Sequence, residues 1–293
     1  MTSATAGSQS SSMALVLTYH SHHVVGDEYG RNDHRAFVQD LELLTAAGFR
    51  IVPLATLVDA LQQTHGGSQS RPFGDRLVAL TFDDGPVYDV ADFDHPEFGP
   101  QRSFLNAMRD FRARHGTAAQ PDLHATSFVI ASREARRAIE ETFDAEYTYL
   151  GPRSMEDDWW LPAIETGLVA IANHSWDHLH PGLSRVAHSL QVRADFRQVL
   201  TAEDADVQIR DAAAFIASQT NDKAEPFFAY PFGHYNDFLV HDYFPHYGGQ
   251  SVRAAFTVEP RAVAKTDSLW CVPRYVCGDD WRTCEDLSRI LSQ

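Results

Sequence analysis

The chain has 293 residues, of which 44% are hydrophobic and 22% are charged, a composition typical of a folded globular protein. Its 40 acidic residues outnumber the 24 Lys and Arg residues, and the formal net charge of −16 disfavours binding to nucleic acids or anionic lipid surfaces. No apolar run approaches the roughly 20 residues of a membrane helix, so no membrane span is expected.

Residues 1–12 are small and polar and predict a disordered tail, followed by a single domain at residues 13–293. This stretch contains no basic residue, and the apolar run behind it is too short for a signal peptide, so a cytoplasmic location is expected. The 3 cysteines are odd in number and lack CxxC spacing, which favours free thiols over a disulfide framework or a zinc clip.

Short apolar runs alternate with helical patterns along the rest of the chain. The runs are typical of strands buried on both faces, and they cover residues 14–19, 77–82, 125–130, 168–172, 226–230, 254–258 and 271–276. The helical patterns start at residue 33 and continue at residues 102–114, 133–143, 160–166 and 205–218. This alternation predicts an α/β fold with a parallel sheet. About seven such units favour a distorted (β/α) barrel over an open sheet with a second domain.

Polar residues follow several of these runs, and a parallel barrel forms its active site at the carboxyl ends of its strands. The run at residues 77–82 is followed by Asp83, Asp84, Gly85 and Pro86. Gly-Pro turns the chain, and the two adjacent carboxylates can serve a metal ion and its water. A solvated turn is an equally weighted alternative for this sequence taken alone.

A second polar cluster, Asn173 to His180, follows the run at residues 168–172. His174 and His178 are four residues apart, so one helical turn would bring both imidazoles onto one face. Two imidazoles and one carboxylate suit Zn²⁺ and leave a fourth position for water. Because the two aspartates are expected at the same end of the barrel, the histidine pair predicts a metal site.

The third cluster, Phe228 to Asn236, places aromatic residues around Pro231 and Gly233. Such a segment can wall a pocket and present a backbone N–H to an oxyanion. A packed aromatic loop is the alternative.

Taken together, these clusters resemble the polysaccharide deacetylases, which have the NodB-homology fold of carbohydrate esterase family four. Residues 81–86 and 173–178 match the first two motifs of that family, and residues 230–233 resemble its third motif without the arginine. In order and spacing the resemblance covers most of residues 13–276, which implies one deacetylase-like catalytic domain over residues 13–293.

The resemblance implies a role for each matched residue. Asp83 is the general base, and Asp84, His174 and His178 hold one divalent metal ion. Zn²⁺ is the first choice, with Co²⁺, Ni²⁺ and Mn²⁺ as alternatives. The backbone N–H of Phe232 contributes to the oxyanion hole.

The chain departs from the family pattern near its C-terminus, where no histidine motif follows Val276. The sequence from Leu17 to His20 stands at the N-terminus instead, which resembles the circularly permuted branch typified by poly-N-acetylglucosamine deacetylases. His20 is therefore the candidate general acid, with His234 as the next candidate. His22 and His23 are interpreted as loop histidines.

Arg274, on the last predicted strand, is expected to replace the missing arginine beside Asp83, with a surface salt bridge as the alternative. Tyr230, Pro231 and Trp160 are expected to contact substrate, although core packing is an equal alternative for Trp160. Residues 87–98 form a longer segment than the family usually allows and are expected at the mouth of the site.

The predicted reaction is removal of an acetyl group from an N-acetylated polysaccharide, oligosaccharide or glycoconjugate by metal-activated water. Two alternatives remain. One is an allantoinase-like hydrolase that acts on cyclic amides or on another small amide, and the other is a non-catalytic carbohydrate-binding relative. The chain keeps Asp83 and the three predicted metal ligands, which favours an enzyme and ranks deacetylation first.

Overall fold

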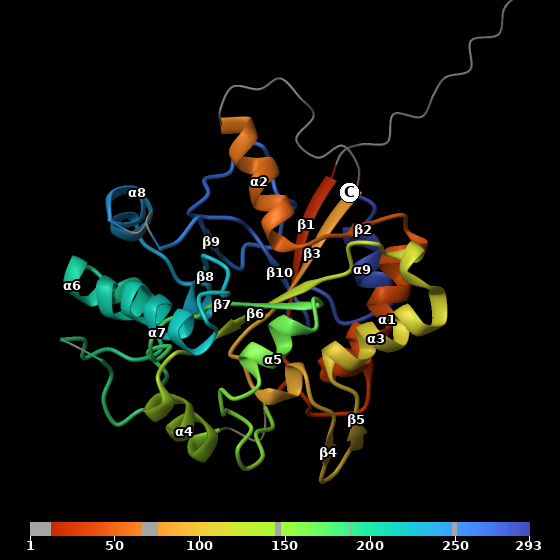
Figure 1. The fold of residues 1–293 in the computed structure, drawn as a ribbon, viewed down its shortest axis with the longest axis horizontal. Helices are drawn as coiled ribbons and strands as arrows, with labels where there is room; N and C mark the ends of the chain where they lie inside the picture. The colour runs from red at the N-terminus through yellow and green to blue at the C-terminus, as the bar shows by residue number, and fades with distance from the viewer. Residues whose placement is uncertain (1–12, 66–75, 144–147, 188, 248–250) are drawn as a thin grey trace, which may run out of the picture.

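A parallel sheet forms the centre of the molecule (Figure 1), seen in a computed structural model that describes residues 13–65, 76–143, 148–187, 189–247 and 251–293. Its strands are β1 Met13–Tyr19, β2 Arg50–Ile51, β3 Arg76–Phe82, β6 Ala125–Val129, β7 Val169–Asn173, β8 Phe227–Ala229, β9 Ala254–Phe256 and β10 Tyr275–Val276. They pair in the order β10-β1-β3-β6-β7-β8-β9, and β2 pairs with β3. The predicted tail at residues 1–12 lies outside the described residues.

The two ends of this strand order are joined. Phe256, at the end of β9, forms a parallel bridge with Val272, shortly before β10. The Thr257 N–H donates to the Val272 carbonyl over 2.8 Å, and the Val272 N–H donates to the Ala255 carbonyl over 2.9 Å. The sheet therefore curls into the predicted single-domain, distorted (β/α) barrel. The predicted run at residues 271–276 shortens to β10, because Pro273 has no N–H to donate to a sheet.

β1 is buried along its whole length because both of its faces are covered. Ala14 and Val16 pack inside the barrel with strand residues such as Phe128, while Leu15 and Leu17 pack beneath the surrounding helices. These helices are α1 Asp33–Ala46, α3 Phe104–His115 and α9 Cys284–Ile290, which lie side by side in Figure 1. β1 pairs with both β10 and β3, so the first strand lies next to the last, as a circular permutation requires.

The other helices are α2 Leu54–His65, α4 Arg133–Thr142, α5 Trp160–Glu165, α6 Ala202–Ala205, α7 Ala212–Gln219 and α8 Phe244–His246. A π-helical stretch at Asp206–Asp211 separates α6 from α7 inside the predicted helix 205–218. Side-chain oxygens of Asn32, Ser103, Ser132 and Thr283 accept hydrogen bonds from backbone N–H groups at the starts of α1, α3, α4 and α9. These caps explain where the predicted helices begin.

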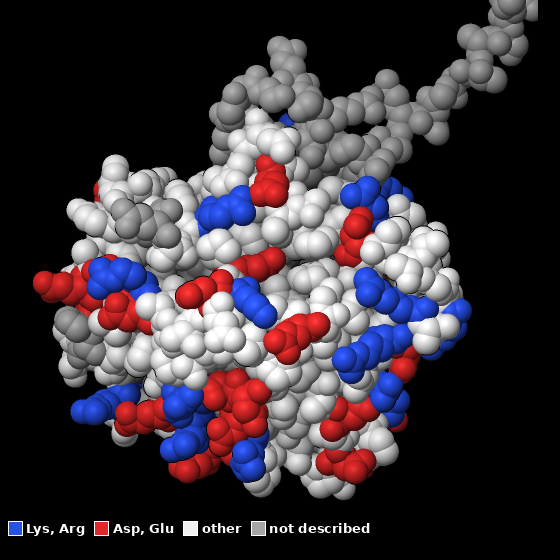
Figure 2. Space-filling model, in the orientation of Figure 1, with Lys and Arg blue, Asp and Glu red and all other residues white. Residues whose placement is uncertain are grey.

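The segment after Pro86 forms a 3₁₀ turn at Val87–Asp89 and an antiparallel hairpin of β4 Phe93–His95 and β5 Gly99–Gln101. Basic and acidic side chains are interspersed on the face seen in Figure 2, so the net charge does not gather there in one patch. Within the described ranges, no helix is both long enough and apolar enough to cross a bilayer. The three cysteines are free, as expected.

Candidate metal and active site

The carboxyl ends of β1, β3, β7 and β8 meet at a cavity of about 890 Å³. Its polar wall contains residues from the segments that follow β1, β3 and β7: His20, His22, Asp83, Asp84, His174 and His178. Segments that are far apart in the sequence therefore supply one site, at the end where a parallel barrel is expected to carry it.

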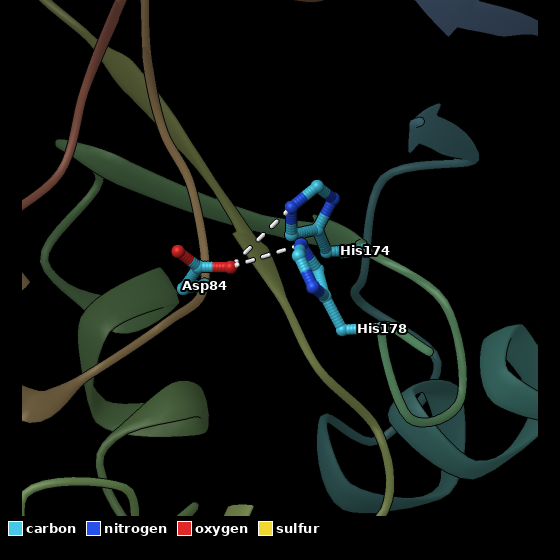
Figure 3. Close-up of side chains that lie close together, drawn as sticks. All are labelled: Asp84, His174 and His178. Carbon is cyan, nitrogen blue, oxygen red and sulfur yellow. Dashed lines mark ion pairs between the residues drawn. The ribbon is translucent and has the colours of Figure 1, made fainter. Parts of the chain in front are cut away.

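Asp84, His174 and His178 converge in this cavity (Figure 3), with donor atoms that all lie within 4.8 Å of one another. Oδ1 of Asp84 is 3.5 Å from Nε2 of His174 and 3.4 Å from Nε2 of His178. Two donors that each bind a tetrahedral ion at about 2.1 Å lie roughly 3.4 Å apart. The spacing and the donor types therefore fit a divalent ion such as Zn²⁺.

The tautomer of His174 also fits a metal ligand. Its Nδ1–H donates to the Ala229 carbonyl over 2.9 Å, since a carbonyl oxygen can only accept. This bond leaves the Nε2 lone pair facing Asp84 and orients the ring, as backbone carbonyls commonly do for histidines that bind metals.

A tight turn, rather than the predicted helical turn, brings His178 back to His174. φ is positive at Ser175 (73°) and at His178 (60°). The Asn173 side chain accepts from the Ser175 N–H over 2.9 Å, and Ser175 Oγ accepts from the His178 N–H over 2.9 Å. Short polar side chains thus satisfy the backbone groups that a helix would have paired, so the four-residue spacing works through a different backbone path.

Asp84 also lies in a turn with positive φ, at 73°, followed by Gly85 at 71°. A Cβ on Gly85 would lie 2.6 Å from Cγ1 of Val129, so only glycine fits between this turn and β6. Aspartate tolerates the left-handed conformation better than most residues, and here that conformation leaves its carboxylate in the cavity.

The electrostatics favour deprotonated ligands. Burial acts to raise the pKa of Asp84, but His178 and His174 outweigh it and hold that pKa well below its usual range. Burial lowers the pKa of His178 to about 3. At neutral pH the site therefore presents a carboxylate and a neutral imidazole, the forms that bind a cation.

Asp83 faces Arg274. Its Oδ1 accepts from Nη1 over 2.8 Å and its Oδ2 accepts from Nη2 over 2.7 Å, while Nε of Arg274 donates to the Thr257 carbonyl over 3.0 Å. Burial acts to raise the pKa of Asp83, and the guanidinium outweighs it and keeps that pKa low. Arg274 is 0% exposed, so the alternative of a surface salt bridge is excluded.

The family model for polysaccharide deacetylase matches residues 70–243, more than half of the chain. The chain belongs to the polysaccharide deacetylase family. No curated protein sequence matches it.

Several solved structures share the fold of this polysaccharide deacetylase-family chain. Streptococcus pyogenes deacetylase PplD, solved in complex with acetate, is 17% identical with a TM-score of 0.57, and the match covers 95% of this chain and 98% of PplD. A de-N-acetylase from Aggregatibacter actinomycetemcomitans is 17% identical with a TM-score of 0.59, and the match covers 94% of this chain and 99% of that protein. IcaB from Ammonifex degensii is 20% identical with a TM-score of 0.56, and the match covers 97% of this chain and 99% of IcaB. At such identities the matches establish the fold.

The two candidate acids lie in different places in this family member. His20 lines the cavity, and its backbone N–H donates to Oδ2 of Asp33 over 2.7 Å. His234 is not among the residues that line it, and its Nδ1 lies 3.5 Å from Oδ1 of Asp195. The placement favours His20 over His234.

His22, interpreted from the sequence as a loop histidine, is part of the site. Its Nε2 lies 3.2 Å from Oδ2 of Asp84, and burial lowers its pKa to about 4. No simple spacing could have identified it, because residues 20–23 form a turn in which the His23 N–H donates to the His20 carbonyl over 2.9 Å. His23 also lines the cavity, but its Nδ1 bonds Oδ1 of Asp33 over 2.7 Å.

The structure corrects three predicted substrate contacts. Tyr230 is fully buried and its hydroxyl donates to the Trp270 carbonyl over 2.9 Å, so its side chain belongs to the core. Trp160 is also fully buried, and the Arg136 guanidinium lies 4.8 Å from its ring centroid. Pro231 is buried outside the cavity lining. These side chains are stabilised in the core because their apolar surface is removed from water there. In that position a substrate cannot contact them.

Phe232, in contrast, lines the cavity and is 37% exposed. It sits at a φ of 58°, with its ring centroid 4.4 Å from that of His178. The left-handed conformation turns this residue out of the buried segment, which explains why it reaches the site when Tyr230 and Pro231 do not.

The hairpin segment lies beside the main cavity rather than at its mouth. Side chains of residues 95–98 line a second cavity of about 750 Å³, which shares Arg31, Phe143 and Thr148 with the first. Asp89, at the start of the segment, is fully buried between Ser21 and Ser127, whose hydroxyls donate to it over 2.5 and 2.6 Å. This part of the segment supports the loop that carries His20 and His22.

Proposed function

We propose that this protein is a metal-dependent deacetylase that removes acetyl groups from N-acetylated sugars in a polysaccharide, oligosaccharide or glycoconjugate. Asp84, His174 and His178 would hold the ion, with Zn²⁺ as the first choice. A divalent ion at that position polarises an amide carbonyl and makes a nearby water more acidic. The names of the structural neighbours, which include a de-N-acetylase, support this choice of reaction class.

Asp83 acts as the general base in this account. Its Oδ2 lies 3.9 Å from Nε2 of His174, which places it beside the ion-binding group. Arg274 holds both of its oxygens in a fixed direction and keeps the carboxylate ionised, so it is ready to accept the proton of the attacking water.

Two further groups complete the reaction. The backbone N–H of Phe232, in the exposed left-handed turn, donates to the oxyanion that develops on the carbonyl oxygen. His20 donates a proton to the departing amine, which is otherwise too basic to leave. Both residues line the same cavity as the two aspartates.

The observation that carries the proposal is the pairing of two carboxylates with different partners in one cavity. Asp84 faces imidazoles at the spacing of metal ligands, and Asp83 faces a guanidinium. A hydrolase that uses metal and base together needs both arrangements side by side.

The test is acetate release from N-acetylglucosamine oligomers by the purified full chain. We expect release by the protein loaded with Zn²⁺, loss of release after chelation, and recovery when the ion is restored. Ring opening of a cyclic amide is measured in parallel. Acetate release that survives complete removal of metal contradicts the proposal, and so does turnover of the cyclic amide alone.

A further inference from the structure

We propose that His22 is a positioning residue, whose Nε2–H holds the Asp84 oxygen that faces away from the two ligand histidines. The inference rests on the proposed function, because it concerns the same ion site. It starts from the different neighbours of the two Asp84 oxygens. Oδ1 lies 3.4–3.5 Å from the Nε2 atoms of His174 and His178, whereas Oδ2 lies 3.2 Å from Nε2 of His22.

The backbone around His22 is anchored on several sides, which restricts the positions that its ring can take before any ion binds. The His22 carbonyl accepts from the Tyr149 N–H over 2.7 Å and from the Thr148 hydroxyl over 3.0 Å. The hydroxyl of the preceding Ser21 donates to buried Asp89 over 2.5 Å. Such support is what a residue needs in order to orient a ligand, since a mobile ring would lose entropy on making the contact.

The surroundings of the two ring nitrogens favour Nε2 as the protonated one. Nδ1 of His22 is buried and has no partner within the described part of the chain. A proton on Nδ1 would therefore be a buried and unpaired N–H, whereas a proton on Nε2 meets the Asp84 carboxylate. A neutral imidazole donor can orient this carboxylate. A guanidinium in the same place would also put a fixed positive charge beside the metal ion.

The geometry favours a positioning role over direct ligation. His22 is not part of the set of donor atoms that lie within 4.8 Å of one another. By occupying Oδ2, it leaves Oδ1 of Asp84 to the ion and to the side where His174 and His178 lie. Outer partners that orient metal ligands typically change metal affinity by about 10–100-fold when they are removed.

The primary test measures the dissociation constant for Zn²⁺ alone, by competition with a chromophoric chelator and without substrate. We expect His22→Phe, which keeps a ring but loses the donor, to bind about 10–100-fold more weakly than wild type. His22→Gln keeps an N–H donor and should recover most of the affinity. His23→Phe is the matched control and should bind as wild type, because His23 bonds Asp33 and not Asp84.

Wild-type affinity in His22→Phe overturns the inference but leaves the proposed function intact, provided that the wild type still releases acetate in a Zn²⁺-dependent manner. A wild type that binds no Zn²⁺ overturns both. The number of imidazoles around Co²⁺, counted by X-ray absorption in the wild type, gives a second measurement that needs no variant. Two imidazoles support the positioning role, whereas three would make His22 a ligand and overturn it.

Discussion

Asp83 and Asp84 are neighbours in the sequence, yet their side chains meet two different environments. On the Arg274 side, the Asp83 carboxylate is 5% exposed and both of its oxygens accept from one guanidinium. On the histidine side, the Asp84 carboxylate is 19% exposed and faces His22, His174 and His178. The first carboxylate already has a permanent counter-charge, whereas the second faces imidazoles, and burial lowers the pKa of two of them, His22 and His178, to about 4 and about 3.

The two environments explain how adjacent aspartates can serve two functions. A carboxylate that a buried arginine holds by two hydrogen bonds is fixed and ionised, but its charge is already neutralised. A carboxylate that faces imidazoles instead of a guanidinium keeps its negative charge for a cation. The positive φ at Asp84 separates the two side chains and makes the division possible.

The largest expected effect comes from the base on the Arg274 side. We expect Asp83→Asn to reduce acetate release by about 10²–10⁴-fold, because an amide cannot accept the proton of the attacking water. Its bound metal should remain, since the ligands lie on the histidine side. Turnover within a few-fold of wild type, measured with equal metal content, would point to another base.

The next effect concerns stability. Arg274→Gln leaves the buried Asp83 charge uncompensated, which should lower the free energy of unfolding by about 3–5 kcal/mol in the metal-free protein. The double variant with Asp83→Asn should recover part of that loss, because no unpaired charge remains. Denaturant titration of the single and double variants measures this coupling. Additive losses would show that the ion pair is not a unit.

His20→Gln tests the acid that reaches the cavity from β1. We expect turnover to fall by about 10²-fold with unchanged metal content, because the departing amine loses its proton donor. His234→Gln is the matched control and should retain turnover, since His234 lies outside the cavity lining. The assignment fails when the two variants show the opposite order.

The smallest effect comes from Asp89, a third carboxylate, whose partners are the hydroxyls of Ser21 and Ser127. Burial raises the pKa of Asp89 from 3.8 to about 7, although the hydrogen bonds from Ser127 and Ser21 act to lower that pKa. Between about pH 4 and pH 7 the folded state therefore holds a proton that the unfolded state has lost. Stability from this group falls as pH rises through that window, by at most about 1.4 kcal/mol per pH unit.

Asp89→Asn removes this proton uptake, so the free energy of unfolding should fall less steeply between pH 5 and pH 7 than in the wild type. Denaturant titrations at several pH values in that range give the two slopes. Asn is the matched replacement, because it resembles the protonated carboxyl in shape and in hydrogen bonding. Parallel slopes in the two proteins would mean that Asp89 is ionised in the folded state at neutral pH.

The sequence predicts which strand ends meet, and it does so for physical reasons. Parallel strands share a polar end, so Asp84 and His174 could be brought together without knowledge of the connecting loops. The pairing of Arg274 with Asp83 was expected for a different reason, because the resemblance to the family implies an arginine beside the base and the third motif lacks one. The barrel itself is visible in the alternation of apolar runs and helical patterns.

The burial of individual side chains and the backbone geometry of turns were harder to predict from the sequence. Tyr230 and Trp160 carry the same apolar groups whether they line a pocket or fill a core, and only the packing around them decides which. His22 reaches Asp84 through a turn whose shape depends on distant partners such as Tyr149. The left-handed conformations of Ser175 and His178 likewise cannot be predicted from a four-residue spacing that suggests a helix.

The most direct test of the account is the metal content of two single variants, purified and dialysed against Zn²⁺ under the same conditions. Asp83→Asn and Asp84→Asn differ by one position, and each replaces a carboxylate by an amide of the same size. The account predicts about one Zn²⁺ ion per chain in Asp83→Asn, as in the wild type, and none in Asp84→Asn. Equal metal content in the two variants would contradict the division of roles between the two aspartates.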